Sequence, residues 1–209
     1  MIDVFIQNID KVSPEEYNDF LLTLPKAMQK EVLKYREKED RQRTLVGKML
    51  LLNYLKIDTS FTLFDIEKSL YHKPFIPNSN ISFNISHSGK YVVVACTLSN
   101  VIGIDVEEMK EGISIGEFKE VFSLEEYSYI KKSKEPLNTF YSLWTKKEAL
   151  LKAEGKGLLD DIQAVKISED KIVFKNRKYF TLSYELNNHL ISLVYKNIDE
   201  INWEIDNLN

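Results

Sequence analysis

The stretch Tyr91-Val-Val-Val-Ala-Cys-Thr-Leu-Ser-Asn-Val-Ile-Gly-Ile-Asp-Val-Glu107 places two apolar segments on either side of a short polar turn. Valine and isoleucine dominate both segments, and β-branched residues favour strands. We therefore predict strands over residues 91–98 and 101–107, with a turn at Leu98-Ser99-Asn100. This turn is the best candidate for a domain boundary, and it divides the chain into an N-terminal half, residues 1–100, and a C-terminal half, residues 101–209.

Each half combines helices with strands that follow one another along the chain. Ser13, followed by Pro14 and by Glu16, predicts the start of a first helix with a capping box. Apolar spacing predicts further helices over residues 26–34, 38–55, 115–132 and 136–154. The remaining strands are predicted over residues 2–7, 61–66, 81–86, 162–167, 171–174, 179–186 and 190–195. This order indicates an α+β fold and not the strict alternation of a doubly wound sheet.

The composition argues against several classes of protein. The chain has 209 residues, of which 44% are hydrophobic and 29% are charged, as in a globular protein with a core of its own. A net charge of −4 disfavours bulk binding to nucleic acid or to anionic membranes. The single cysteine, Cys96, excludes an internal disulfide, and three histidines argue against a multi-histidine zinc site. No apolar run approaches the ~20 residues of a membrane span, and we expect a cytoplasmic protein.

The strand over residues 101–107 carries two carboxylates on one face. Successive side chains alternate between the faces of a strand, so Asp105 and Glu107 point the same way, roughly 7 Å apart. Aspartate is poorly suited to a strand interior, and a pair of carboxylates needs water or a cation to relieve its repulsion. The pair therefore indicates either a polar face in contact with solvent or a site for Mg²⁺, which prefers hard oxygen ligands.

The helix that we expect to end at Gly155 also carries charged side chains on one face. Trp144, Glu148 and Lys152 are spaced four residues apart and share one face of this helix. Glu148 and Lys152 suit an ordinary surface ion pair, which contributes little energy. Alternatively, Glu148 completes a three-carboxylate metal set with Asp105 and Glu107, and Lys152 meets a phosphate oxygen.

Two further features suit the binding of an anion. Ser86, His87 and Ser88 lie where a predicted strand enters a hairpin turn, and such a turn offers hydroxyls, an imidazole and backbone amides. Ordinary turn chemistry and a structural histidine explain the same residues. Residues 26–48 contain eight basic and four acidic residues, a local positive excess that suits either a solvated helix face or a polyphosphate ligand.

Taken together and in this order, the segments resemble the Sfp-type 4′-phosphopantetheinyl transferases. Ile102-Gly-Ile-Asp-Val-Glu107 is similar to the family's first signature, and Trp144-Thr-Lys-Lys-Glu-Ala-Leu-Leu-Lys152 is similar to the second, W-x-x-K-E-(S/A)-x-x-K. Three upstream segments fit as well, Arg43-Thr-Leu-Val-Gly47, Lys73-Pro74 and Asn84-Ile-Ser-His-Ser-Gly89. The resemblance covers residues 1–195. It implies two similar α/β halves, a pseudo-two-fold axis and an active site in the cleft between the halves. The shorter carrier-synthase branch of the family assembles this cleft from separate subunits, which a chain of 209 residues does not need, so we expect a monomer.

The resemblance also implies the reaction and its residues. The 4′-phosphopantetheine arm of coenzyme A passes to a serine of an apo acyl or peptidyl carrier protein, and adenosine 3′,5′-bisphosphate is released. In the C-terminal half, Asp105, Glu107 and Glu148 hold Mg²⁺, Glu148 is the candidate base, directly or through a water, and Lys152 stabilises the pyrophosphate. In the N-terminal half, the coenzyme A contacts are Lys30, Arg43 and His87 at the 3′-phosphate, Ser86 and His87 near the diphosphate, and Lys73 and Pro74 beside the adenine.

Two positions depart from the family pattern. Ala27 replaces a frequent lysine one turn before Lys30, and His72 replaces the glycine that commonly precedes Lys73. We expect these changes to weaken coenzyme A binding and to leave the chemistry intact. Two other functions use the same residues, a metal-dependent phosphohydrolase or nuclease, and a catalytically silent module that binds coenzyme A or a carrier. The segment from Phe118 to Lys132 is the expected docking surface for the carrier.

Overall fold

The computed structural model describes residues 1–155, 162–206 and 208, and the chain divides into two compact units. Unit 1 comprises Met1–Ser99 together with Asp199–Asn209, and unit 2 comprises Asn100–Ile198. The division after Ser99 falls in the turn that the sequence indicates. Residues 199–209 were expected in the C-terminal half and lie in unit 1, because their strand pairs with the first strand of the chain.

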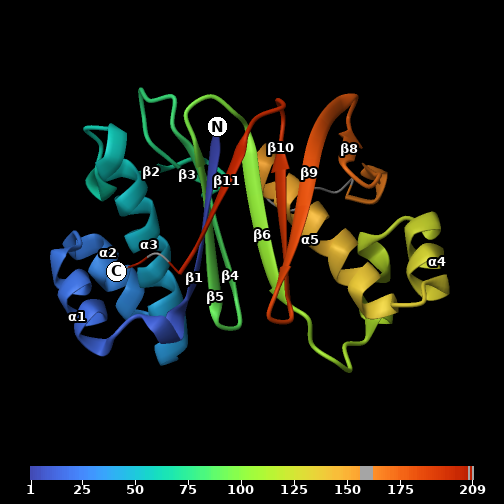
Figure 1. Cartoon of the computed structure of the whole chain (residues 1–209), viewed down its shortest axis with the longest axis horizontal. Coiled ribbons are helices and arrows are strands. Elements are labelled where there is room, and N and C mark those ends of the chain that lie inside the picture. Colours follow the sequence, from blue (N-terminus) through green and yellow to red (C-terminus); the bar gives the residue numbers. More distant parts are fainter. Residues whose placement is uncertain (156–161, 207, 209) are drawn as a thin grey trace. The chain divides into compact units, whose positions relative to one another are not determined.

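Unit 1 packs three helices against one face of a four-stranded sheet (Figure 1). The strand order is β11-β1-β5-β4, in which β1 and β11 are parallel and the other neighbours are antiparallel. The strands are β1 (Ile2–Asn8), β4 (Ser82–Ser88), β5 (Tyr91–Thr97) and β11 (Ile201–Ile205). The helices are α1 (Pro14–Thr23), α2 (Lys26–Leu33) and α3 (Lys38–Asp58). A small hairpin joins β2 (Glu67–Lys68) to β3 (Pro74–Phe75).

The core of unit 1 lies between this sheet and the helices. Phe83 of β4 and Val94 of β5 belong to one buried cluster with Leu51 and Leu55 of α3. The predicted capping box of α1 is present: the backbone N–H of Glu16 donates to Ser13 Oγ at 3.2 Å, and that of Ser13 donates to Glu16 Oε2 at 2.7 Å. The cap satisfies backbone donors that the first turn of a helix leaves unpaired.

Unit 2 places a long helix on a five-stranded antiparallel sheet of order β6-β10-β9-β8-β7 (Figure 1). The strands are β6 (Ile102–Glu108), β7 (Lys166–Ile167), β8 (Lys171–Phe174), β9 (Arg177–Leu186) and β10 (His189–Tyr195). The long helix is α5 (Pro136–Glu154), which contacts β6 and β10, and α4 (Leu124–Lys132) packs beside it. α5 begins with a proline in its first turn and ends at Gly155, whose φ of 67° is left-handed, as the sequence predicts.

Asn100 fastens the two ends of unit 2 to each other. Its side-chain nitrogen donates to the carbonyl oxygen of Asn197 at 2.8 Å, and its side-chain oxygen accepts from the backbone N–H groups of Lys196 and Asn197 at 3.1 and 3.0 Å. Asn100 is buried. The point where the chain enters unit 2 therefore lies directly beside the point where it leaves.

The α+β fold class is confirmed, and three local expectations are wrong. The strand expected over residues 61–66 is a 3₁₀ turn, Leu63–Asp65, because the side chains of Thr62 and Asp65 cap this turn. The helix expected over residues 115–132 is a 3₁₀ segment, Ile115–Val121, followed by α4, which Ser123 begins with its own capping box. Residues 162–167 form a short 3₁₀ turn, Ile162–Ala164, before β7. Among the described residues, no helix is both long and apolar enough to cross a bilayer.

Candidate active site

In unit 2, helix α5 lies directly against β6, and a glycine makes this approach possible. A β-carbon added at Gly103 would come within 2.0 Å of the carbonyl oxygen of Ala149 and within 2.5 Å of the backbone nitrogen of Ala153. Since Gly103 shares its strand face with Asp105 and Glu107, this face looks toward α5 and away from solvent. The alternative of a solvent-facing polar strand is thereby wrong for Asp105, which is only 3% exposed.

The carboxylates of β6 meet the predicted helix residues. Lys152 Nζ lies 2.6 Å from Asp105 Oδ1, and the side chain of Asp105 is far more buried than that of Lys152. Trp144 Nε1 approaches Glu107 Oε1 at 3.5 Å, a long contact for a hydrogen bond. The structure thus brings together the strand residues and the helix residues that the sequence assigned to one site.

Glu148 lies within electrostatic reach of the same groups. Burial raises the pKa of Glu148, and the negative charges of Asp105 and Glu107 raise it further, while the positive charge of Lys152 opposes them. A carboxyl group held in this way gives up its proton less readily than one in water, and its carboxylate is a stronger proton acceptor.

The donor set has the chemistry that Mg²⁺ requires, three carboxylates with neither thiol nor imidazole among them. The carboxylates are not gathered around one point, however. In the portions of the chain that the structure describes, no group of three or more His, Cys, Asp or Glu side chains is arranged to hold a metal ion. Asp105 instead directs one oxygen at the ammonium of Lys152.

Unit 1 contains a pocket of about 600 Å³ between α2, α3, the β2–β3 hairpin and β4, which we call the lysine pocket. Apolar side chains such as Leu51 and Phe83 form part of its wall. Its charged and titratable lining residues are Glu31, Lys34, Lys48, Lys68 and His72. Three lysines against one glutamate give the pocket a positive excess, and apolar walls beside lysines suit a ligand with a flat base and a phosphate.

Glu31 partly neutralises the lysine pocket. Its carboxylate lies 2.8 Å from Lys68 Nζ and 3.5 Å from Lys48 Nζ. The hydrogen bond from Lys68 lowers the pKa of Glu31, burial opposes this effect, and the charge of Lys48 adds to it. Two of the three lysines therefore share one internal counter-ion, and a bound phosphate would compete with Glu31 for them.

Of the six coenzyme A contacts that the sequence predicts in the N-terminal half, one lines this pocket, Pro74. Arg43 donates to the carbonyl oxygen of Gly89 at 2.8 Å and pairs with Asp40, so its guanidinium ties α3 to the β4–β5 turn. His87 is exposed and follows the pocket residue Ile85 on the same face of β4, whereas Ser86 is buried on the opposite face. Lys30 on α2 is exposed, and Lys73 is half-buried in the hairpin.

The sequence reasoning missed Lys34, Lys48 and Lys68 as pocket residues. Lys34 and Lys48 belong to the basic run over residues 26–48, and this run indicated an anion site. Helical spacing alone did not distinguish these two lysines from the other basic residues of the run. Lys68 reaches the pocket through the β2–β3 hairpin, which the sequence did not predict. His72, singled out as a departure from the family pattern, lies in this hairpin with a left-handed φ of 62° and lines the pocket.

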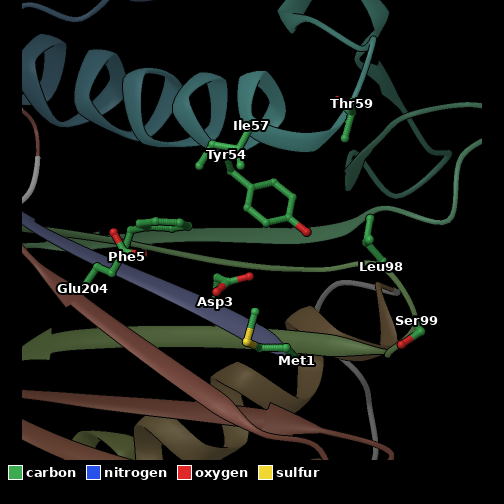
Figure 2. Close-up of a pocket in the computed structure, with 9 residues that line it drawn as sticks. All are labelled: Met1, Asp3, Phe5, Tyr54, Ile57, Thr59, Leu98, Ser99 and Glu204. Carbon is green, nitrogen blue, oxygen red and sulfur yellow. The ribbon is translucent and has the colours of Figure 1, made fainter.

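A second cavity of unit 1, of about 240 Å³, has the opposite electrostatic character. Figure 2 shows it between the end of α3, which contributes Tyr54, and β1, which contributes Asp3. Glu204 of β11 adds a second carboxylate, and the aromatic rings of Phe5 and Tyr54 lie 6.3 Å apart at its wall. Two carboxylates repel a phosphate, so of these two cavities the lysine pocket is the one that suits a phosphorylated ligand.

The comparisons with known proteins agree with these observations in both halves. Residues 11–99 match the family model described as 4′-phosphopantetheinyl transferase, N-terminal, and residues 101–194 match that of the 4′-phosphopantetheinyl transferase superfamily. The 4′-phosphopantetheinyl transferase ffp of Bacillus subtilis is 39% identical over 171 residues, covering 78% of this chain and 75% of the relative. The transferase Sfp of Bacillus subtilis is 38% identical over 152 residues, 70% and 67% of the two chains. The transferase gsp of Aneurinibacillus migulanus is 31% identical over 185 residues, 84% and 76% of the two chains. The chain belongs to the Sfp-type 4′-phosphopantetheinyl transferase family.

Proposed function

We propose that this protein transfers the 4′-phosphopantetheine arm of coenzyme A to a serine of an apo acyl or peptidyl carrier protein. The observation that carries the proposal is the packing of α5 on β6 in a chain of this family, which pairs Lys152 with Asp105 and brings Glu148 within electrostatic reach of both and of Glu107. The serine oxygen forms a bond to the phosphorus next to the pantetheine. The bond from this phosphorus to the bridging oxygen of the pyrophosphate breaks, and adenosine 3′,5′-bisphosphate leaves.

Unit 2 supplies the groups for this chemistry. Asp105, Glu107 and Glu148 would hold Mg²⁺, which when bound supplies positive charge to the reacting pyrophosphate. Glu148, directly or through a water, accepts the proton of the carrier serine, and its raised pKa makes its carboxylate a better acceptor. Lys152 lies beside Asp105 and stabilises the negative charge of the leaving phosphate.

Unit 1 supplies the binding of coenzyme A. The lysine pocket accepts the adenine and the 3′-phosphate, with Pro74 beside the base and Lys34 and Lys48 near the anion. Lys30, Arg43, Lys73, Ser86 and His87 remain proposed contacts of the phosphates and the base. Because both sets of residues belong to one chain, we propose that the protein acts as a monomer, and we place it in the cytoplasm, where coenzyme A and carrier proteins are found.

Intact-protein mass spectrometry tests the reaction. Purified protein is incubated with coenzyme A, Mg²⁺ and several apo carrier domains, with and without EDTA. We expect a phosphopantetheine mass gain on at least one carrier and none with EDTA. The variant Asp105→Ala should abolish the gain, whereas Asp170→Ala, at an exposed position of unit 2, should keep it. Cleavage of coenzyme A without a carrier would favour the phosphohydrolase, and binding without any reaction would favour the silent module.

A further inference from the structure

Three hydroxyl side chains of unit 2 form a hydrogen-bonded row between α5 and the sheet, which we call the hydroxyl chain. Thr145 of α5 donates to the carbonyl oxygen of Tyr141 at 2.9 Å, and its Oγ1 lies 2.7 Å from Ser192 Oγ of β10. Ser192 Oγ lies in turn 2.9 Å from Ser183 Oγ of β9. Thr145 and Ser192 are both 0% exposed, so bulk water does not compete for these bonds.

The hydrogens of the hydroxyl chain have one consistent direction. A hydroxyl group has a single hydrogen to donate and two lone pairs with which to accept. Because Thr145 gives its hydrogen to Tyr141, it accepts from Ser192, and Ser192 accepts from Ser183. A buried polar network whose members all have partners specifies one arrangement, since a shift of either element leaves a hydroxyl without its partner.

The hydroxyl chain lies beside the carboxylate strand. Ser192 stands directly opposite Asp105 in the register of β10 with β6. Thr145 precedes Glu148 by three residues, roughly 60° short of one helical turn, and Lys152 by seven residues, roughly 20° short of two turns. The hydroxyl chain therefore anchors the side of α5 that carries Glu148 and Lys152.

The other contacts of this seam bring α5 close to the sheet without fixing its position along the sheet as sharply. Ala149 and Ala153 meet Gly103 through small side chains and backbone. The attraction between small apolar groups is weak for each atom pair and has no preferred direction, whereas a hydrogen bond weakens steeply when it lengthens or bends. The hydrogen bonds of Thr145 are thus the directional part of the seam.

We propose that Thr145 is a positioning residue, which through Ser192 sets the register of α5 against β6 and so the placement of Glu148 relative to Asp105. The proposal rests on the transferase function proposed above, in which these two carboxylates act on the substrates. Thr145 itself touches neither substrate, and its effect on the reaction passes through the helix.

Steady-state kinetics with coenzyme A and an apo carrier test the proposal. Thr145→Val removes the hydroxyl and keeps the shape of the side chain, and we expect it to lower kcat about tenfold, because small misplacements of reacting groups are costly. The KM for coenzyme A should change less than about twofold, since the lysine pocket belongs to unit 1. Thr145→Ser keeps the hydroxyl and should restore kcat to within about threefold of the wild type.

Thr181→Val is the matched control. Thr181 is buried on β9, and within the described part of the chain its hydroxyl has no hydrogen-bond partner. The change from threonine to valine is the same as at residue 145, but it breaks no hydrogen bond of the hydroxyl chain. We expect kcat and KM of Thr181→Val to equal those of the wild type.

A second readout reports the position of α5 without using the reaction. In a Trp203→Phe background, Trp144 of α5 is the single tryptophan of the chain, and its ring packs against Phe118 and Phe140. We expect Thr145→Val to shift the emission maximum of Trp144, and Thr145→Ser and Thr181→Val to leave it in place. A wild type that modifies no carrier would refute the proposed function, whereas the emission still decides whether Thr145 positions α5.

Each remaining outcome counts against the proposal. An unchanged kcat of an active Thr145→Val enzyme would overturn it, and so would an unchanged emission maximum of Trp144 in this variant. An equal loss of kcat in Thr145→Ser would show that the hydroxyl is not the group responsible, and an equal loss in Thr181→Val would show that any buried threonine has this effect. If Thr145→Val does not fold, as judged by circular dichroism, Ser192→Ala carries both measurements with the same expected and contradicting results.

Discussion

Gly103 and Ala149 lie so close that a β-carbon at residue 103 would sit 2.0 Å from the Ala149 carbonyl oxygen. The contact is with backbone, which no change of rotamer relieves. We predict that Gly103→Ala displaces α5 from β6, lowers the free energy of unfolding by about 3 kcal/mol, and reduces transferase activity more than a hundredfold. Gly116→Ala is the matched control, since its nearest neighbour would be Tyr127 Oη at 3.8 Å. Urea denaturation and the mass-spectrometric assay measure both effects, and near-normal activity in Gly103→Ala would contradict this account of the site.

Lys147, next to Glu148 in sequence, is a structural cation. Its side chain is fully buried, and Nζ lies 2.8 Å from Glu126 Oε2 and 3.0 Å from the carbonyl oxygen of Ile162. Glu126 also caps α4, so one ammonium joins α5, α4 and the turn at Ile162. We predict that Lys147→Met lowers the free energy of unfolding by ~3–5 kcal/mol, because it leaves a carboxylate without its partner. Lys166→Met should change it by less than ~0.5 kcal/mol. Thermal and urea unfolding measure the difference, and equal stability of the two variants would refute the structural role.

Glu31 competes with ligands for the cations of the lysine pocket. We predict that Glu31→Gln tightens coenzyme A binding about fivefold, or ~1 kcal/mol, because Lys48 and Lys68 lose their internal counter-ion. Ala27→Lys, at another lining position, should also tighten it. Isothermal titration calorimetry measures both, and weaker binding by Glu31→Gln would place the anion elsewhere.

The same ion pairs make a prediction about pH. Because the pKa of Glu31 is lowered below its ordinary value of 4.5 in the folded protein, the unfolded chain binds the proton more readily. The stability that Glu31 contributes is therefore present above pH 4.5 and is lost as the pH falls through the lowered value. Denaturation from pH 7 to pH 3 should show the wild type losing its advantage over Glu31→Gln in this range, and a constant difference would contradict the assignment.

His72 occupies a backbone conformation that suits glycine. Its φ is 62°, and a side chain in the left-handed region costs about 1 kcal/mol. We predict that His72→Gly raises the free energy of unfolding by up to ~1 kcal/mol and opens the lysine pocket, so that coenzyme A binds more tightly. Asn78→Gly is the control, because Asn78 also has a positive φ, of 56°, and asparagine tolerates it. A lower free energy of unfolding for His72→Gly would contradict this prediction. It would show that contacts of the imidazole stabilise the fold by more than the backbone strain destabilises it.

Cys96 is predicted to be unreactive in the folded protein. It is fully buried on β5, and burial raises the pKa of its thiol well above the usual value, which disfavours the reactive thiolate. We expect N-ethylmaleimide to label the native protein at pH 8 at least ~100-fold more slowly than the urea-unfolded protein. Mass spectrometry after timed quenching measures both rates, and rapid native labelling would mean that β5 opens frequently.

The sequence predicted correctly the elements with strong local signals. It failed for elements whose structure depends on residues far away along the chain. Strand β5 has a run of β-branched residues, and helix α5 has apolar residues at helical spacing and a glycine at its end. The bounds of each were therefore predicted within a residue or two. Strand β11 was missed because its stability comes from pairing with β1, almost two hundred residues earlier. Residues 61–66 were misassigned because the hydrogen bonds of Thr62 and Asp65 outweigh the strand preference of the apolar residues.

For the candidate site, too, the sequence predicted some features and not others. The face shared by Asp105 and Glu107 follows from the strand period, and that shared by Glu148 and Lys152 follows from the helix period. The sequence did not predict that Lys152 would pair with Asp105, nor that Phe122, within the expected docking segment, is buried against Phe140. Such contacts depend on how two elements pack, which neither period encodes.

The hydrogen bonds by which Asn100 joins the two ends of unit 2 have a consequence for how the protein folds during its synthesis. Unit 2 is topologically an insertion between β5 and β11 of unit 1, and its entry and exit lie side by side. The ribosome releases the whole of unit 2 before it releases β11, so unit 2 can fold co-translationally. The sheet of unit 1 cannot be completed until β11 has been released. Folding of unit 2 then brings the two flanking segments together, which shortens the loop that β1 and β11 must close and lowers its entropic cost.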